Sequence, residues 1–446
     1  MNTLEINRQL AQGDAIEPGV LPKLDELARE PFVFKLHFGL DSLPAEPGVI
    51  LVRGARQYGK STWLQTQIRE TVKSYGPGSA FYLNGDEVRD GQALAEQIRQ
   101  LLPLFSAKAP VRRLFIDEIT AVKDWTKTLK VLLDSGELRQ TLLVTTGSKA
   151  ADLRHATERL PGRKGKLART GYIFTPMPFA EFRRVCASAL PTAHLLPAYL
   201  IAGGSPPACA AVAATGRLPD YIIEMVRDWI YGEFAAGGRS RSMLLGVLEC
   251  LYRFAGTPAG QSKLAREAGL ANNTVAAGYV EALSDLMCVA TAFAWDADRK
   301  RSNRRRPCKF HLTNLLVSTA WHPRRIRTPA DYLNLPEDAQ GALMEWAVAQ
   351  ECWRRSTLRG DEMPELMHYW QGGNHELDFV LGSAEFLEVK RGRTGPLDFA
   401  WFPKSFPNGR LTVVGASRFE TDQVVGVTLE DFLLQEEEAV GSHRNK

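Results

Sequence analysis

The chain has 446 residues, of which 44% are hydrophobic and 24% charged, and its formal net charge is +4 at pH 7. Such a chain can bury a sizeable core and exceeds one ordinary domain, so we expect about two to four domains and exclude a disordered protein. No stretch approaches the roughly 20 apolar residues of a membrane span, and residues 1–19 are too polar for a signal peptide. We therefore expect a cytoplasmic protein that does not enter the membrane.

The cysteines exclude two further classes of protein. They lie far apart and form no Cys-x-x-Cys pair, which argues against a zinc ribbon and against a disulfide framework. We expect reduced and mostly buried thiols at Cys186, Cys209, Cys250, Cys288, Cys308 and Cys352.

After a polar segment of about thirty residues, short β-rich runs alternate with helical stretches, which is typical of a parallel sheet with crossover helices. The predicted strands cover residues 49–52, 80–83, 114–117, 142–146 and 172–174.

Residues 54–61 read Gly-Ala-Arg-Gln-Tyr-Gly-Lys-Ser directly after the first predicted strand. This is the G-x-x-x-x-G-K-[ST] pattern, in which Gly54 and Gly59 let backbone N–H groups close around phosphates. Lys60 would reach the β- and γ-phosphates, and Ser61 would hold Mg²⁺ at the start of a helix whose positive end faces the anion. The pattern predicts an ATP–Mg²⁺ site, and the alternative is a chance match in a glycine-rich turn.

Hydrolysis requires carboxylates on a neighbouring strand, and residues 114–118 supply them. Asp117 would support the Mg²⁺ shell, and Glu118 would accept a proton from the attacking water as the general base. The alternative is an ordinary acidic strand end. The following strand ends in hydroxyls, where Thr146 or Ser148 would sense the γ-phosphate.

Residues 179–235 are predicted to be helical, with a turn at residues 203–207. The next stretch has helix-turn-helix spacing, because a short amphipathic helix over 262–268 ends at Gly269 and Asn272 or Asn273 can cap a second helix. Two strands, residues 287–293 and 308–312, complete a predicted winged helix.

The loop between these two strands is strongly basic. Residues 299–309 contain seven cations in eleven positions. A solvated loop is one interpretation. Contact with nucleic-acid phosphates is the other, and its candidate residues are Arg301, Arg304, Arg305 and Arg306.

The last β-rich segments, near residues 366–370, 376–381, 385–390 and 410–415, contain an Asp followed ten residues later by Glu-x-Lys. This is the arrangement of PD-(D/E)xK nucleases. A three-residue loop at 382–384 would place Asp378 across from Glu388, where two carboxylates require a cation such as Mg²⁺. Lys390 shares a strand face with Glu388 and would orient the attacking water. The alternatives are an exposed hairpin that carries ordinary surface charge and a nuclease fold that has lost its activity.

Together these motifs resemble the AAA+ superfamily, and more narrowly the bacterial and archaeal ATPases whose C-terminal region is called DUF4143. The matching pieces are residues 54–62, 117–118, 146–148, 160–163, 176–182 and 199–206. Ala55 replaces the proline that commonly follows the first glycine of the loop, a departure that should not affect phosphate binding. The resemblance implies that Thr62 belongs to the nucleotide site and that Glu345 joins the nuclease-like residues. It also makes Arg163 the leading candidate for a residue that senses the γ-phosphate or for an arginine finger that acts on a neighbouring subunit of a ring or other homo-oligomer.

The expected fold class is therefore α/β, with seven successive regions. These are an N-terminal segment (1–30), a P-loop AAA+ core (31–178), a helical lid (179–240), a winged helix with a basic wing (241–312), a linker (313–336), a restriction-endonuclease-like α/β domain (337–435) and a tail (436–446).

Three functions remain open on the sequence. The first is an ATP-dependent protein that processes nucleic acid, DNA in the first instance, with ATP use coupled to Mg²⁺-dependent cleavage. The second is a nucleotide-driven switch or DNA-binding ATPase whose terminal domain does not cut. The third is an ATPase that docks a protein partner and binds no nucleic acid.

Overall fold

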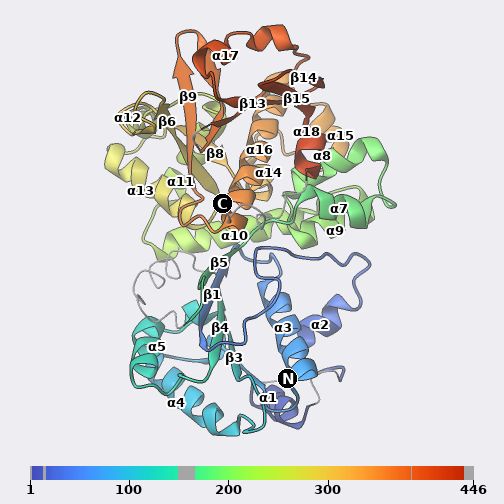
Figure 1. Ribbon diagram of the computed structural model, residues 1–446, viewed down its shortest axis with the longest axis vertical. Helices are drawn as coiled ribbons and strands as arrows, with labels where there is room; N and C mark the ends of the chain where they lie inside the picture. Colours follow the sequence, from blue (N-terminus) through green and yellow to red (C-terminus); the bar gives the residue numbers. More distant parts are fainter. Residues whose placement is uncertain (1–2, 14–16, 149–165, 383, 436–446) are drawn as a thin grey trace. The chain divides into compact units, whose positions relative to one another are not determined.

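A computed structural model describes residues 3–13, 17–148, 166–382 and 384–435. The chain divides into two compact units, residues 1–175 and 176–446 (Figure 1). All six cysteines are buried and none forms a disulfide. In the described part of the chain, no helix is long and apolar enough to cross a membrane.

The first unit contains a five-stranded sheet in the order β2-β3-β4-β1-β5, and every neighbouring pair is parallel. The five predicted strands are thereby confirmed as β1 (Gly48–Gly54), β2 (Ala80–Asn84), β3 (Arg113–Asp117), β4 (Leu142–Gly147) and β5 (Gly171–Phe174). Because the carboxyl ends of parallel strands meet at one edge, the segments that follow β1, β3 and β4 converge there.

Helices cover both faces of this sheet (Figure 1). On one face lies α3 (Lys60–Tyr75), and α4 (Gly91–Leu101) and α5 (Trp125–Asp134) cover the other, where they bury an apolar core against β1–β4. The strands are buried over nearly their whole length, which explains why they are near-continuous apolar runs rather than alternating ones.

The N-terminal segment forms two helices that the sequence did not predict, α1 (Thr3–Gln12) and α2 (Pro22–Leu27). The side-chain amide of Asn7 binds the edge strand β2 twice, since its Nδ2 donates to the Tyr82 carbonyl and its Oδ1 accepts from the Tyr82 N–H, both at 2.7 Å. Two polar backbone groups of an edge strand are thereby satisfied.

In the second unit, the segment that was predicted as a helical lid forms four helices. The predicted turn lies between the second and the third of them. They are α7 (Phe179–Cys186), α8 (Thr192–Ala202), α9 (Pro206–Thr215) and α10 (Asp220–Ala236). The turn requires glycine, because Gly203 has a φ of +64° and a Cβ there would lie 2.2 Å from the Leu316 nitrogen.

The predicted helix-turn-helix is present, and Asn272 caps its second helix by accepting from the Val275 N–H at 2.9 Å. The basic run is not one loop, because its middle forms a strand that pairs with β6. The elements are α11 (Arg241–Arg253), α12 (Gln261–Glu267), α13 (Asn273–Asp285), β6 (Val289–Asp296), β7 (Arg301–Asn303) and β8 (Lys309–Leu312).

The predicted linker contains two short helices, α14 (Leu315–Trp321) and α15 (Pro329–Leu333). Beyond it, β9 (Leu366–Gly372) pairs in parallel with β6 and antiparallel with β10 (His375–Leu377). The regions predicted as a winged helix and as a terminal domain therefore share one sheet.

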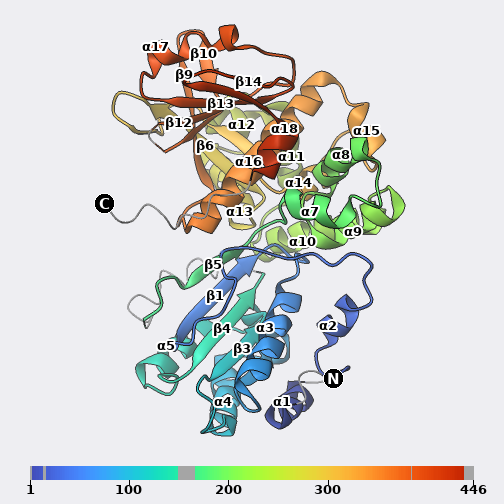
Figure 2. The same ribbon diagram turned by 45° about the vertical axis from the view of Figure 1, so that its right-hand side comes forward.

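A third sheet has the order β11-β12-β13-β15-β14. Figure 2 shows α17 on one side of it and the long helix α16 with α18 on the other. The bounds are α16 (Glu337–Arg359), β11 (Phe379–Leu381), β12 (Glu385–Val389), α17 (Phe402–Ser405), β13 (Arg410–Gly415), β14 (Phe419–Glu420), β15 (Val424–Thr428) and α18 (Leu429–Leu434).

Candidate functional site

The loop after β1 has the backbone shape that a phosphate cradle needs. It leaves the sheet at Gly54 and enters α3 at Lys60, and Gly59 is the helix cap with a φ of +99°. A Cβ on Gly54 would lie 2.7 Å from the Cβ of Phe174, so a side chain there would push the loop off β5. Both glycines of the motif are thus required by the backbone.

Lys60 is only 5% exposed and turns back onto its own loop. Its Nζ donates to the carbonyls of Gly54 at 2.9 Å and Ala55 at 2.8 Å. Burial lowers its pKa to about 8, against the opposing effect of the charges on Glu118 and Asp117. The ammonium lies where an anion in the loop would contact it.

Asp117 ends β3 beside the loop and is 7% exposed. Its carboxylate accepts hydrogen bonds from the hydroxyls of Thr146 and Ser61, and burial raises its pKa in spite of them. Asp117 and Ser61 therefore offer two adjacent oxygen donors, the kind of ligand that Mg²⁺ prefers. These residues fit the ion that the sequence predicts.

Glu118 has a φ of +46°, the left-handed region that a side chain rarely adopts. Its N–H lies 3.2 Å from Asp117 Oδ1 and 3.2 Å from Thr146 Oγ1. Its carboxylate accepts from the Ser148 hydroxyl at 2.6 Å and from the Ser148 N–H at 3.0 Å. The two hydroxyls that we expected to face a γ-phosphate thus contact the two carboxylates of the site.

Thr62 lies in the first turn of α3 and its carbonyl accepts from Thr66 Oγ1 at 2.9 Å. Arg163, the predicted arginine finger, lies outside the described residues.

The four predicted nuclease residues come together in the second unit. β11 and β12 pair with the register that continues to Asp378 opposite Glu388, and the Asp378 N–H donates to Glu388 Oε2 at 3.1 Å. Lys390 forms an ion pair with Glu388, and α16 carries Glu345 to the same place. The predicted hairpin geometry is present.

A fifth residue, which the sequence analysis missed, lies among them. Lys309 of β8 is 1% exposed. Its Nζ donates to Asp378 Oδ1 at 2.7 Å, forms an ion pair with Glu376, and lies 3.8 Å from Glu345 Oε1. A lysine on a buried strand requires acidic partners, but the sequence alone does not show which distant carboxylates these are.

Glu345, Glu376, Asp378 and Glu388 form a carboxylate cluster around Lys309, and the pKa values of Lys309, Glu345 and Glu388 within it are shifted. Burial alone would lower the pKa of Lys309, but Asp378, Glu345 and Glu376 together raise it. Burial and then the charge of Asp378 raise the pKa of both Glu345 and Glu388. The raised pKa values of Glu345 and Glu388 reflect several carboxylates buried side by side next to Lys309.

The cluster does not fit Mg²⁺ as it stands, because the Lys309 ammonium lies against Asp378, the carboxylate that the ion would need. Among the described residues, no group of three or more His, Cys, Asp or Glu side chains is arranged to hold a metal ion.

The four predicted nucleic-acid-binding arginines are all exposed on or just after β7. Arg304 lies over the ring of Phe293 at 5.1 Å, and Arg306 reaches the Gln371 carbonyl at 3.4 Å. Arg301 and Arg305 extend the same exposed basic segment.

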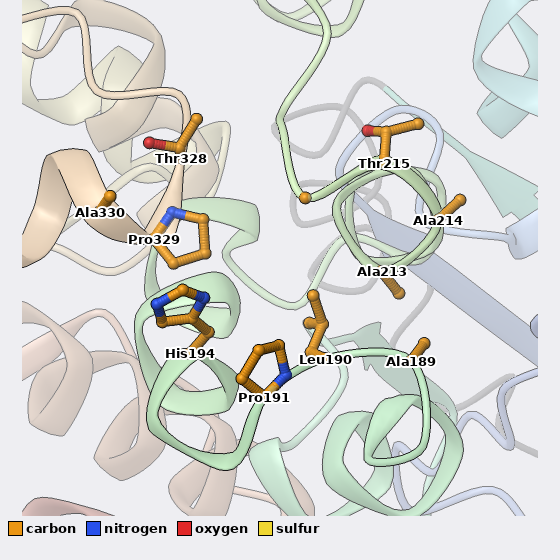
Figure 3. A pocket seen from close by; sticks show the side chains of 11 residues that line it. Ala189, Leu190, Pro191, His194, Ala213, Ala214, Thr215, Thr328, Pro329 and Ala330 are labelled. Atoms are coloured by element: carbon orange, nitrogen blue, oxygen red, sulfur yellow. The ribbon is translucent and has the colours of Figure 1, made fainter.

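Figure 3 shows a mostly apolar cavity of about 540 Å³ in the second unit, with Leu190 and His194 on its wall. Its other walls come from α9 and from residues 328–330. None of the predicted site residues that the structure describes lines it.

Comparison with known proteins identifies one region. Residues 46–183 match the AAA domain family AAA_14. No curated protein matches the chain.

Several solved structures are similar at low identity. A Walker-type ATPase of Pyrococcus abyssi has 13% identity and a TM-score of 0.43, covering 67% of this chain and 93% of its own. The Aeropyrum pernix ORC1 protein in complex with DNA has 14% identity and a TM-score of 0.33, covering 69% and 95%. A Thermotoga maritima RuvB variant has 13% identity and a TM-score of 0.31, covering 55% and 81%.

The family match covers the parallel sheet, the phosphate loop and the carboxylates that follow β3. The chain therefore carries an AAA-type P-loop ATPase domain over residues 46–183.

Proposed function

We propose that the chain binds and hydrolyses ATP with Mg²⁺ and uses this cycle as a switch on nucleic acid, with DNA as the expected class. The supporting observation is the convergence of Lys60, Asp117, Glu118 and Thr146 at one edge of the sheet beside the phosphate loop. A phosphate loop alone binds, whereas a loop with an adjacent carboxylate pair can also hydrolyse.

Each residue has a separate task in this proposal. Lys60 exchanges the carbonyls of Gly54 and Ala55 for phosphate oxygens, which are stronger acceptors. Ser61 and Asp117 hold Mg²⁺, which supplies charge neutralisation at the β- and γ-phosphates. Glu118 accepts the proton of the attacking water, and its two hydrogen bonds from Ser148 hold the carboxylate in place.

Glu118→Gln tests the assignment of the general base. We expect ATP turnover to be lost while ATP binding remains, because the amide keeps the size of the side chain but cannot take the proton. Lys60→Ala is the matched variant and should lose binding as well. Unchanged turnover in Glu118→Gln would remove Glu118 from this role.

We also propose that Arg163 acts as an arginine finger on a neighbouring copy, so that the active form is a homo-oligomer. Mixing Arg163→Ala chains with Glu118→Gln chains tests this, since a finger acting between copies would restore turnover in mixed assemblies. Turnover that stays at the level of either variant alone would contradict the proposal.

Nucleic acid is proposed to bind at the basic segment, because Arg301, Arg304, Arg305 and Arg306 are exposed within six residues. Replacing the last three with alanine should weaken binding. It should also reduce the slope of the logarithm of the binding constant against the logarithm of the salt concentration, by about the contribution of three phosphate contacts. Arg89→Ala, at an exposed arginine of the first unit, is the control. If no DNA or RNA binds at low salt, a protein-docking ATPase becomes the better assignment.

We propose that the terminal domain does not cleave. The competing function, cleavage coupled to ATP use, needs Mg²⁺ at Asp378 and Glu388, where Lys309 already neutralises Asp378. Wild type and Asp378→Ala should leave plasmid, single-stranded and branched DNA equally intact with Mg²⁺ and ATP. Cleavage by wild type that Asp378→Ala abolishes would establish the nuclease instead.

A further inference from the structure

The carboxylate cluster gathers acidic side chains from three parts of the second unit around one buried ammonium. Glu345 comes from α16, Glu376 from β10 and Asp378 from the residue between β10 and β11, and Glu388 comes from β12. Lys309 enters from β8, and its Nζ contacts two of these carboxylates directly. Isolated carboxylates are not buried in this way unless a cation lies among them.

A second observation shows that the Lys309 ammonium does not contact every buried acceptor of the cluster. Glu345 is 8% exposed, and among the described residues its Oε1 has no hydrogen-bond partner, although it lies 3.5 Å from His311 Nδ1 and 3.8 Å from Lys309 Nζ. At 3.8 Å the Lys309 Nζ is too far from this oxygen for a hydrogen bond. The neighbouring His311 is fully buried, and neither of its ring nitrogens has a hydrogen-bond partner.

These contacts distinguish an ammonium from a metal ion. An ammonium has three N–H donors and here serves Asp378 and Glu376. A divalent ion of the Mg²⁺ type takes about six oxygen ligands and would draw in Glu345 as well. The cluster therefore has the acceptors of a cation site, but it holds a side chain in the position of the ion.

We propose that Lys309 is the resident cation of this cluster, replacing a divalent metal ion, and that removing its ammonium opens a divalent-cation site formed by Glu345, Asp378 and Glu388. Lys309 also ties β8, and with it the hairpin that carries the basic segment, to α16 and to the β11–β12 hairpin. This inference extends the non-cleaving form of the proposed function and is independent of ATP hydrolysis.

Manganese binding to the nucleotide-free protein tests the proposal. Electron paramagnetic resonance would measure free Mn²⁺, and the ions bound per chain would follow by difference from the amount added. The proteins compared are wild type, Asp378→Asn, Lys309→Met, Lys309→Arg and the double variant that combines Lys309→Met with Asp378→Asn. Lys309→Met should bind about one more ion per chain than the double variant does. Lys309→Arg keeps the positive charge and should gain none.

The comparison of wild type with Asp378→Asn tests whether the native cluster already holds a metal ion. Wild type and Asp378→Asn should bind the same number of ions, since Lys309 already occupies the cluster. An ion bound by wild type and lost in Asp378→Asn would overturn the proposal. So would a Lys309→Met chain with a native circular dichroism spectrum that gains no ion.

The outcome also separates this inference from the proposed function. Wild type that binds no ion at the cluster and yet cleaves DNA would refute the non-cleaving assignment while leaving Lys309 as the resident cation. Loss of ATP turnover in Glu118→Gln bears on neither result.

Discussion

The most informative prediction concerns the proton on Lys60. In the nucleotide-free protein this side chain is buried against its own loop, and burial lowers its pKa from 10.5 to about 8. Phosphate oxygens beside the ammonium favour the charged form, so we expect ATP to restore the pKa to at least its ordinary value. The difference of 2.5 units corresponds to about 3 kcal/mol of coupling between ATP binding and protonation.

Two measurements follow from this coupling. At pH 9 the free protein would hold Lys60 mostly neutral and the complex would hold it charged, so binding should take up about 0.9 proton. For the same reason the affinity should be about tenfold weaker at pH 9 than at pH 7. The γ-phosphate of ATP is already ionised at pH 9 and does not contribute.

Isothermal titration calorimetry with a non-hydrolysable MgATP analogue, in buffers with different ionisation enthalpies, measures the proton uptake without the protons that hydrolysis would release. Lys60→Arg is the matched control, because a guanidinium remains charged and its variant should take up no proton. An uptake below about 0.2 proton in wild type, with equal affinity at pH 7 and pH 9, would refute the argument that burial discharges this lysine.

Two further predictions concern stability. Asn7→Ala should lower the free energy of unfolding of the first unit by about 2 kcal/mol, because it leaves the Tyr82 N–H and carbonyl of the edge strand unpaired. Urea denaturation checks this with exposed Arg8→Ala as the control, and equal values for the two variants would contradict it. Burial raises the pKa of Glu345 from 4.5 to about 8. Between these two pH values the folded state binds more protons than the unfolded state does. The free energy of unfolding should therefore fall as the pH rises through this range, by about 1 kcal/mol per pH unit. Glu345→Gln should flatten this dependence in urea denaturation curves at pH 5 to 8, and an unchanged slope would show that Glu345 does not titrate there.

Features with local causes were predictable from the sequence. The loop from Gly54 to Lys60 follows one strand and starts one helix, so its chemistry is contained in a short segment. The position of Asp378 opposite Glu388 could be predicted equally well, because the length of a hairpin loop fixes the register of its strands.

Features that depend on distant contacts were not predictable. Lys309 meets Asp378 across 69 residues of chain, and only the packing of β8 beside the β11–β12 hairpin brings them together. The docking of α1 was missed because only two apolar residues of this short helix, Ile6 and Leu10, are buried, and the third buried residue, Asn7, is a polar side chain that binds backbone. Position 163 could be assigned only through a family resemblance, and it stays a prediction.

The parallel pairing of β9 with β6 has a consequence for how the second unit can be divided. β9 contacts one side of β6, while β7 and β8 hold the other. A chain cut at the predicted linker would therefore lose a neighbour of β6 and leave a buried apolar strand as an open edge, prone to pairing with other chains. The winged-helix and terminal segments are better produced as one piece, and any insertion or deletion that separates them must preserve this ladder.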